Sequence, residues 1–272
     1  MTINCKGKLI DLSKPKVMGI LNLTPDSFYD GGKYKNESEV LSQVYMMLKN
    51  GATFIDVGAY SSRPGAIDIS VDEETNRLLP ILELILKEFP DALISIDTFR
   101  SLVAKLGIDS GAALINDISA GKLDENMMAT VAKLHVPYIM MHMKGTPQTM
   151  KNETQYNDLV HDIMFYFSER LAKAKKLGIV DTIIDPGFGF AKTREQNFAL
   201  LNHLELFKNI YRPILVGLSR KSMIYKTLNT SPTEALNGTS VLNTIALQKS
   251  ANILRVHDVK EAVECIELIN QF

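Results

Sequence analysis

Cysteine, long apolar stretches and excess charge of either sign are all scarce in this chain. Its two cysteines, Cys5 and Cys265, lie far apart in 272 residues; this spacing excludes a disulfide framework and a paired metal-ligand motif, and favours a reducing compartment. No apolar run approaches the roughly 20 residues of a transmembrane helix, and the N-terminus lacks the apolar stretch of a signal peptide. We therefore expect a cytoplasmic protein with no membrane partner. The net charge is −1, from 30 basic and 31 acidic residues, so the composition does not show the excess of basic residues that is typical of nucleic-acid binding.

The chain also lacks a Gly/Ser linker and the dinucleotide-binding glycine pattern, since Gly187 and Gly189 are not followed by the third glycine. What it does contain is eight short apolar runs, each followed by a helical pattern. The runs are 17–21, 53–55, 93–96, 112–115, 136–141, 182–184, 213–218 and 253–256, and the clearest helices are 37–50, 72–89, 100–108, 124–134, 153–177 and 259–270.

Strands that alternate with helices favour a parallel sheet. Eight such units predict an α/β protein with one (β/α)8 TIM barrel spanning 1–272 as a single domain. A short hairpin at about 3–10 is possible before the barrel. A doubly wound open sheet is the alternative.

Each apolar run ends in polar residues. These ends are Asn22, Asp56, Asp97, Asn116, His142, Asp185, the Ser219–Lys221 turn and the Arg255–His257 pair. Any one of them could be a helix cap or a solvated loop residue. In a (β/α)8 barrel, however, the C-terminal strand ends meet at one mouth, where active sites lie. The pattern therefore predicts a site that holds both acidic and basic groups.

The residue types indicate a ligand. Carboxylates and amides at 97, 116 and 185 accept hydrogen bonds from amidine-like N–H edges, and the basic side chains of Arg63, Arg255 and His257 suit an anion such as phosphate. Lys221 and Ser222 begin a helix, where backbone N–H groups favour a carboxylate or phosphate. Asn22 could offer its carbonyl oxygen to Mg²⁺. The residues alone thus predict a nitrogen heterocycle, a phosphate and possibly Mg²⁺.

Seven segments resemble, in order, the motifs of the dihydropteroate synthase family. They are MGILNLTPDSFYDGG (18–32), SSRPG (61–65), SIDTFR (95–100), INDIS (115–119), DPGFGFAK (185–192), GLSRKSMI (217–224) and RVHDV (255–259). The resemblance implies a pterin-binding barrel that joins a dihydropterin methyl diphosphate to 4-aminobenzoate, giving dihydropteroate and diphosphate in folate biosynthesis. It also implies Mg²⁺, a homodimer, and a dissociative mechanism in which the bond to diphosphate breaks first.

The resemblance also implies residue roles. The pterin pocket would be Asp97, Asn116, Asp185 and Lys221; the diphosphate site Asn22, Ser62, Arg63, Arg255 and His257, with Asn22 facing the metal; the 4-aminobenzoate site Phe28, Pro64, Phe190, Lys221 and Ser222; and the catalytic residues Asp97, Lys221, Arg255, His257 and Asp30. No Ser/His or Cys/His nucleophile stands out in the sequence.

One loop departs from the family pattern. Where many members read GGESTRPG, this chain reads GAYSSRPG at 58–65, so that Ala59, Tyr60 and Ser62 differ. Two other functions stay open on the sequence: a pterin-binding methyltransferase that shares the pterin pocket, and a paralogue that binds pterin without catalysis. The first has no use for TPDSFYDGG, SSRPG and the RVH segment, and the intact basic residues argue against the second.

Overall fold

Parallel strands form the centre of the protein. A computed structural model describes residues 1–23, 33–62 and 67–272, with the backbone alone for 33–36. The strands are β3 (Lys16–Asn22), β4 (Phe54–Gly58), β5 (Leu93–Asp97), β6 (Leu114–Asp117), β7 (Tyr138–Met141), β8 (Thr182–Asp185), β9 (Leu215–Val216) and β10 (Ile253–Val256). They are apolar and largely buried, as strands covered on both faces must be.

The strands follow one another around a nearly closed barrel. Their hydrogen-bonded order is β8-β7-β6-β5-β4-β3-β10-β9. The remaining gap is bridged at Ile184 of β8, which pairs in parallel with Ile214 and whose N–H donates to the carbonyl of Pro213 at 3.0 Å. An open doubly wound sheet has two edges and reverses its strand order, so that alternative is wrong and the barrel prediction is confirmed.

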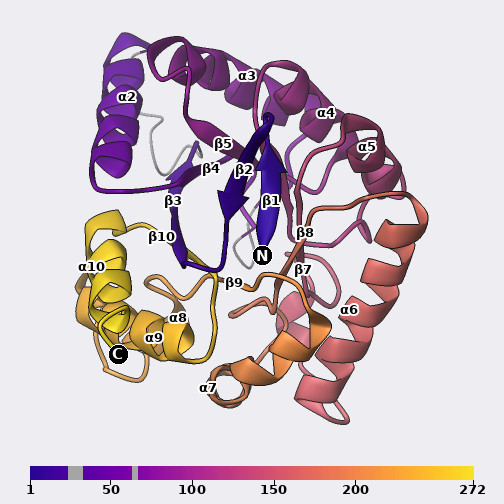
Figure 1. Cartoon of the computed structure of the whole chain (residues 1–272), viewed down its shortest axis with the longest axis vertical. Helices are drawn as coiled ribbons and strands as arrows, with labels where there is room; N and C mark the ends of the chain where they lie inside the picture. The colour runs from indigo at the N-terminus through magenta and orange to yellow at the C-terminus, as the bar shows by residue number, and fades with distance from the viewer. Residues whose placement is uncertain (24–32, 63–66) are drawn as a thin grey trace.

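Helices surround the strands (Figure 1). They are α2 (Lys33–Lys49), α3 (Val71–Glu88), α4 (Ser101–Asp109), α5 (Met127–Leu134), α6 (Leu159–Lys176), α7 (Arg194–Asn202), α8 (Ser222–Tyr225), α9 (Leu236–Gln248) and α10 (Val259–Ile269). In α3 the buried stripe is Leu78, Leu82 and Ile85, and Ser70 caps the first turn. No helix in the described ranges is both long and apolar enough to cross a membrane.

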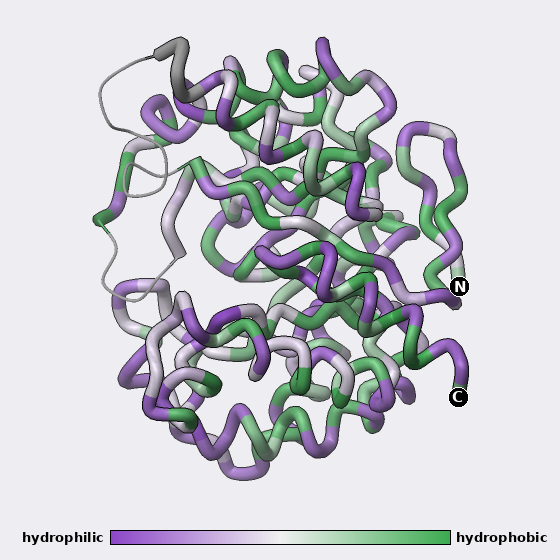
Figure 2. Tube along the Cα trace, turned by 90° about the vertical axis from the view of Figure 1, so that its left-hand side faces the viewer, coloured by the Kyte–Doolittle hydropathy of each residue, from purple (hydrophilic) through white to green (hydrophobic). Residues whose placement is uncertain are grey.

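The hairpin that the sequence predicts before the barrel is present, and it covers one end of the barrel. Strands β1 (Thr2–Cys5) and β2 (Lys8–Asp11) pair antiparallel. Ile3, Cys5 and Ile10 pack in one buried cluster with residues such as Met18 and Phe54 from the first half of the barrel strands. Figure 1 shows the hairpin across the strands, and Figure 2 shows it at one side of the molecule. The C-terminal strand ends therefore lie at the opposite end.

Several elements differ from their predicted bounds, and for two of them the structure gives the physical reason. Strand β9 covers only Leu215–Val216 of the apolar run 213–218, because Pro213 has no N–H to donate and the chain turns away through Arg220, which has a left-handed φ of 54°. Helix α6 begins at Leu159 and not at 153, because Asp158 caps it by accepting from the His161 N–H at 2.9 Å.

Candidate active site

A buried ion-pair cluster lies where β4, β5, β6 and β10 end. Arg255 donates from Nε to Asp56 Oδ2 at 2.6 Å and from Nη2 to Asp97 Oδ2 at 2.7 Å. Asn116 donates from Nδ2 to the same Asp56 oxygen at 2.9 Å. Asp97 and Asn116 are register partners on β5 and β6, which explains their proximity. One guanidinium thus ties together strands that are up to 199 residues apart in the sequence.

The cluster keeps one polar atom without a partner. Asp56 is 0% exposed, and its Oδ1 makes no hydrogen bond with the described residues. A buried carboxylate oxygen without a donor is costly. Its position beside Asp97 and Asn116 therefore leaves an acceptor for a ligand N–H group.

Burial and ion pairing together set the pKa values of this cluster. Burial raises the pKa of Asp97 to about 7, against the opposing effect of the Arg255 guanidinium. For Arg255, burial alone would lower the pKa, but Asp56 and Asp97 outweigh it and raise the value. The guanidinium therefore stays charged and Asp97 titrates near neutral pH.

Asp185 and Lys221 form the second half of the mouth. Asp185 ends β8, and its Oδ1 accepts the N–H of Gly187 at 2.8 Å. Gly187 has a φ of +74°, and a Cβ there would stand 2.1 Å from the His142 carbonyl oxygen, so only glycine fits. Burial raises the pKa of Asp185 and lowers that of Lys221 to about 8, while the attraction between the two groups opposes both shifts.

Lys221 also borders an aromatic wall. Its Nζ donates to the carbonyl of Phe188 and lies 5.0 Å from the centre of the Phe190 ring. Lys221 occupies the N-cap position of α8 without a side-chain capping bond, and Ser222, which is exposed, is the first residue of the helix. The predicted helix start is therefore present, although the helix has only four residues. Lys221 is thus near both Asp185 and Phe190, two residues expected in different pockets.

His257 lies beyond Arg255 at the end of β10 and is held by a serine. Ser219 Oγ and His257 Nδ1 are 3.0 Å apart, and the same oxygen accepts the His257 backbone N–H at 3.2 Å. Ser219 is 5% exposed, so this pair orients the imidazole and does not present a nucleophile. Arg220 points elsewhere, to a two-pronged ion pair with Asp258.

The remaining predicted residues divide into two groups. Asn22, at the end of β3, and Ser62, in the segment after β4, are half-buried. Phe28, Asp30, Arg63 and Pro64 lie outside the described residues.

The sequence did not predict a site role for two residues that the structure places at the mouth, Asp56 and Lys192. Asp56 was recognised only as a strand end, although its position before GAYSSRPG is the same signal that singled out Asp97. Lys192 is buried, and its Nζ contacts the carbonyls of Gly187 and Phe190 and Nδ1 of His142 at 3.0–3.1 Å. Burial lowers the pKa of Lys192 to about 7 and that of His142 well below its usual value. Lys192 fixes the turn that carries Asp185 and Phe190.

The mouth offers a metal few ligands within the ranges that the structure describes. Among the described residues no group of three or more His, Cys, Asp or Glu side chains could hold an ion. The amide of Asn22 at the mouth suits Mg²⁺, which keeps several waters and binds through one or two protein oxygens and substrate phosphates. The residues therefore fit a metal held jointly with a phosphorylated substrate.

The fold and this mouth place the protein among the pterin-binding barrel enzymes, since residues 18–257 match the family described as pterin binding enzyme. The chain is 41% identical over 271 residues to the dihydropteroate synthase of Escherichia coli K12, covering 99% of this chain and 95% of that protein.

Solved structures agree with this relationship. Yersinia pestis dihydropteroate synthase, in a complex with a sulfonamide drug, superimposes with a TM-score of 0.93 at 40% identity, over 100% of this chain and 98% of that one. The Xanthomonas albilineans enzyme with 4-aminobenzoic acid gives 0.92 at 34% identity, over 99% and 97%. The chain therefore belongs to the dihydropteroate synthase family of folate biosynthesis.

Proposed function

We propose that the barrel mouth condenses (7,8-dihydropterin-6-yl)methyl diphosphate with 4-aminobenzoate, giving 7,8-dihydropteroate and diphosphate. The observation that carries the proposal is the buried cluster of Asp56, Asp97, Asn116 and Arg255 with its unpartnered carboxylate oxygen. A pterin has adjacent N–H donors, and one of them could meet the Asp56 oxygen that has no partner. The whole chain 1–272 acts as one domain in this proposal.

The pterin would lie between the two acidic groups of the mouth. Asp185 accepts its amidine-like N–H edge, Asn116 and Asp97 hold the opposite ring, and Lys221 donates to a ring acceptor. A carboxylate binds such an edge through parallel hydrogen bonds. Burial of these groups excludes water, which strengthens each contact.

The diphosphate would lie on the basic side. Arg255 and His257 would face it together with Ser62, and the family resemblance alone adds Arg63. The positive charge of the basic residues stabilises the departing anion. Asn22 would hold Mg²⁺ against the phosphates, and the ion when bound supplies charge neutralisation of the leaving group. His257 is oriented for this role by Ser219, through the contact of 3.0 Å.

The reaction follows a dissociative course in this proposal. The C–O bond to diphosphate breaks first, its electron pair leaves with the diphosphate, and the pterin-methyl cation is then attacked by the amine, which loses a proton. Ionised Asp97 stabilises the cation. Phe190 and Lys221 border the 4-aminobenzoate with Ser222, Pro64 and Phe28, while Asp30 assists catalysis. The roles of the last three rest on the family resemblance alone.

A turnover assay separates this function from its alternatives. Both substrates are mixed with Mg²⁺ and diphosphate release is measured. A methyltransferase would release none and would move a methyl group from a folate instead, whereas a non-catalytic paralogue would bind the pterin without turnover. Omission of 4-aminobenzoate tests the mechanism. Slow diphosphate release, with capture of the pterin-methyl cation by water, supports bond breaking before attack. No diphosphate release under this condition favours direct displacement by the amine.

We further propose a cytoplasmic homodimer. The free, buried cysteines Cys5 and Cys265 suit a reducing compartment, and the dimer is what the family resemblance implies. Light scattering at low protein concentration tests the second point, since a mass of one chain would contradict it.

A further inference from the structure

Tyr60 is the residue at which the loop after β4 departs most from the family motif, and it is buried. The residue is 8% exposed. The ring packs edge-on against Phe99, with ring centres 5.0 Å apart, and the Arg100 guanidinium lies 5.1 Å from the centre of the Tyr60 ring. Tyr60 is therefore fixed against the segment that directly follows Asp97.

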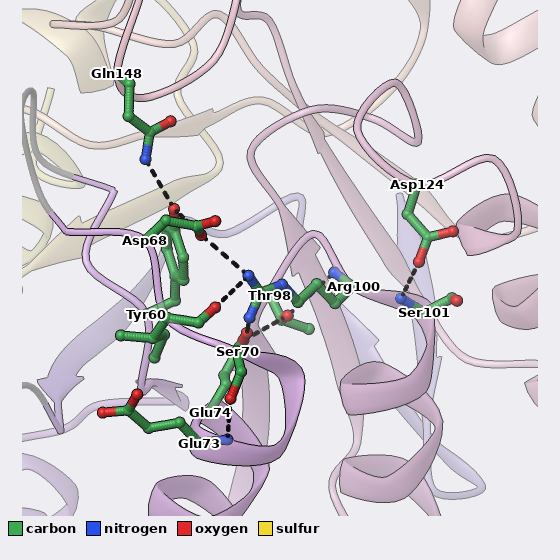
Figure 3. A network of polar contacts seen from close by, with 11 residues as sticks. Tyr60, Asp68, Ser70, Glu73, Glu74, Thr98, Arg100, Ser101, Asp124 and Gln148 are labelled. Atoms are coloured by element: carbon green, nitrogen blue, oxygen red, sulfur yellow. Dashed lines mark hydrogen bonds and ion pairs between the residues drawn. The ribbon is translucent and has the colours of Figure 1, made fainter.

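The Tyr60 hydroxyl joins two further segments (Figure 3). It donates to Asp68 Oδ1 at 3.0 Å and accepts from Gln148 Nε2 at 3.0 Å. Residues 60 and 68 stand on either side of the stretch that contains Ser62 and Arg63, both expected at the diphosphate. The hydroxyl thus ties the two ends of this stretch together and to the loop after β7.

Arg100 anchors the same pair to the barrel. It donates to Asp68 Oδ1 at 3.1 Å and to the Ile69 carbonyl at 2.6 Å, and also to Glu74 Oε2 at 2.9 Å. Glu74 has a side chain that is 1% exposed, and its other oxygen accepts from Thr98 at 2.7 Å. Figure 3 shows these contacts as one continuous network. Thr98 and Arg100 follow Asp97 on the chain, so the network connects Tyr60 and Asp68 to the end of β5.

Tyrosine suits this place electrostatically. Asp68 and Glu74 already share one guanidinium, and the glutamate that many family members carry at position 60 would add a third carboxylate. A neutral phenol gives Asp68 a donor without adding charge, and its ring offers a face to Arg100.

We propose that Tyr60 is a positioning residue for diphosphate binding: through Asp68 and Arg100 its own position is fixed relative to Asp97, so that Ser62, two residues further on, meets the leaving group of a pterin bound at the mouth. The inference rests on the proposed function for the identity of the ligand. Tyr60 itself touches neither substrate. Its removal should therefore affect the diphosphate and spare the pterin.

Tyr60→Phe tests the inference, because it removes the hydroxyl and keeps the ring against Phe99 and Arg100. Tyr211→Phe is the matched control, since Tyr211 is 77% exposed. Calorimetry gives the Kd of inorganic diphosphate with Mg²⁺ in the presence of a pterin that lacks phosphates, and separately the Kd of that pterin alone. Loss of the two hydroxyl contacts is expected to weaken diphosphate binding about tenfold and to leave the pterin Kd unchanged.

Unchanged diphosphate affinity in Tyr60→Phe would overturn the inference. An equal loss of affinity for the pterin and for diphosphate would also overturn it, because a merely structural role produces that result. Asp68→Asn provides a second test. If Tyr60 acts through Asp68, the double variant should bind diphosphate no worse than the weaker single variant, and additive losses contradict the linkage. Failure of the proposed function looks different: the unmodified enzyme would bind both ligands yet release no diphosphate on turnover.

Discussion

Replacement of Asp185 by asparagine should separate pterin binding from folding. The Gly187 N–H donates to Asp185 Oδ1 at 2.8 Å, and an asparagine keeps this bond only through its amide oxygen. The NH₂ group must then take the place of Oδ2 and face the ligand. A donor would meet a donor where a carboxylate had accepted a hydrogen bond.

The size of the effect follows from that geometry. Loss of a hydrogen bond to a charged group, together with an unsatisfied ligand donor, costs about 3–4 kcal/mol, or an affinity loss of roughly 100- to 1,000-fold. Stability should not fall in parallel. Burial raises the pKa of Asp185, so the stability that this group contributes is present below its unfolded pKa and lost as pH rises through its folded pKa. Above its unfolded pKa the carboxyl group therefore lowers the stability of the fold, and the amide, which does not titrate, removes that cost.

Calorimetric titration with a pterin lacking phosphates measures the first effect, and thermal unfolding the second. Asp181→Asn is the control, because Asp181 precedes the same strand at the opposite end of the barrel, where its Oδ2 accepts from the Asn4 N–H at 2.8 Å. A pterin affinity for Asp185→Asn within a few fold of the unmodified protein refutes the assignment of the pocket. An equal loss in Asp181→Asn refutes the claim that the effect is local.

Three further predictions concern other groups of the mouth. Activity should rise as Asp97 ionises near its pKa of about 7 and fall as Lys221 deprotonates near about 8; the pH profile of kcat/KM checks this, and a flat profile between pH 6 and 9, a range about one unit beyond each value, contradicts it. Lys221→Ala should weaken the pterin and 4-aminobenzoate by about tenfold each, because Lys221 stands between Asp185 and Phe190; loss of one alone in calorimetry shows that the pockets do not share it. Lys192→Met should lower the free energy of unfolding by about 2 kcal/mol in urea, because it removes a donor from the Phe190 carbonyl and one of the two donors of the Gly187 carbonyl, which keeps the Phe190 N–H; an unchanged value shows that Lys192 does not hold the turn.

The sequence predicted most of the barrel because its signals are local. Apolar runs such as 182–184, bounded by turn residues, mark buried strands, and the helical stripe at Leu78, Leu82 and Ile85 marks α3. The convergence of Asp97, Asn116 and Arg255 was also predictable, since parallel strands end at one face. The strands, the helices and the shared mouth could therefore be predicted from local patterns and from the order of the elements along the chain.

What the sequence missed depends on contacts across the barrel. No local pattern says that Arg255 pairs with Asp56, because this choice depends on strand register and tilt. The burial of Lys192 follows from the fold of the 186–191 turn, which brings its amine under two carbonyls. The predicted start of α6 at 153 is too early. The spacing of apolar residues is helical from about Tyr156 onward, but the helix begins only after its cap at Asp158. The network around Tyr60 likewise joins residues up to 88 positions apart.

The central claim is that this mouth joins a dihydropterin to 4-aminobenzoate with loss of diphosphate. The most direct measurement quantifies both products in one quenched reaction of the full chain with dihydropterin methyl diphosphate, 4-aminobenzoate and Mg²⁺. The account predicts one dihydropteroate for each diphosphate released, with dihydropteroate absent when 4-aminobenzoate is omitted. Pterin binding without dihydropteroate formation, or diphosphate release that 4-aminobenzoate never converts to dihydropteroate, would contradict it.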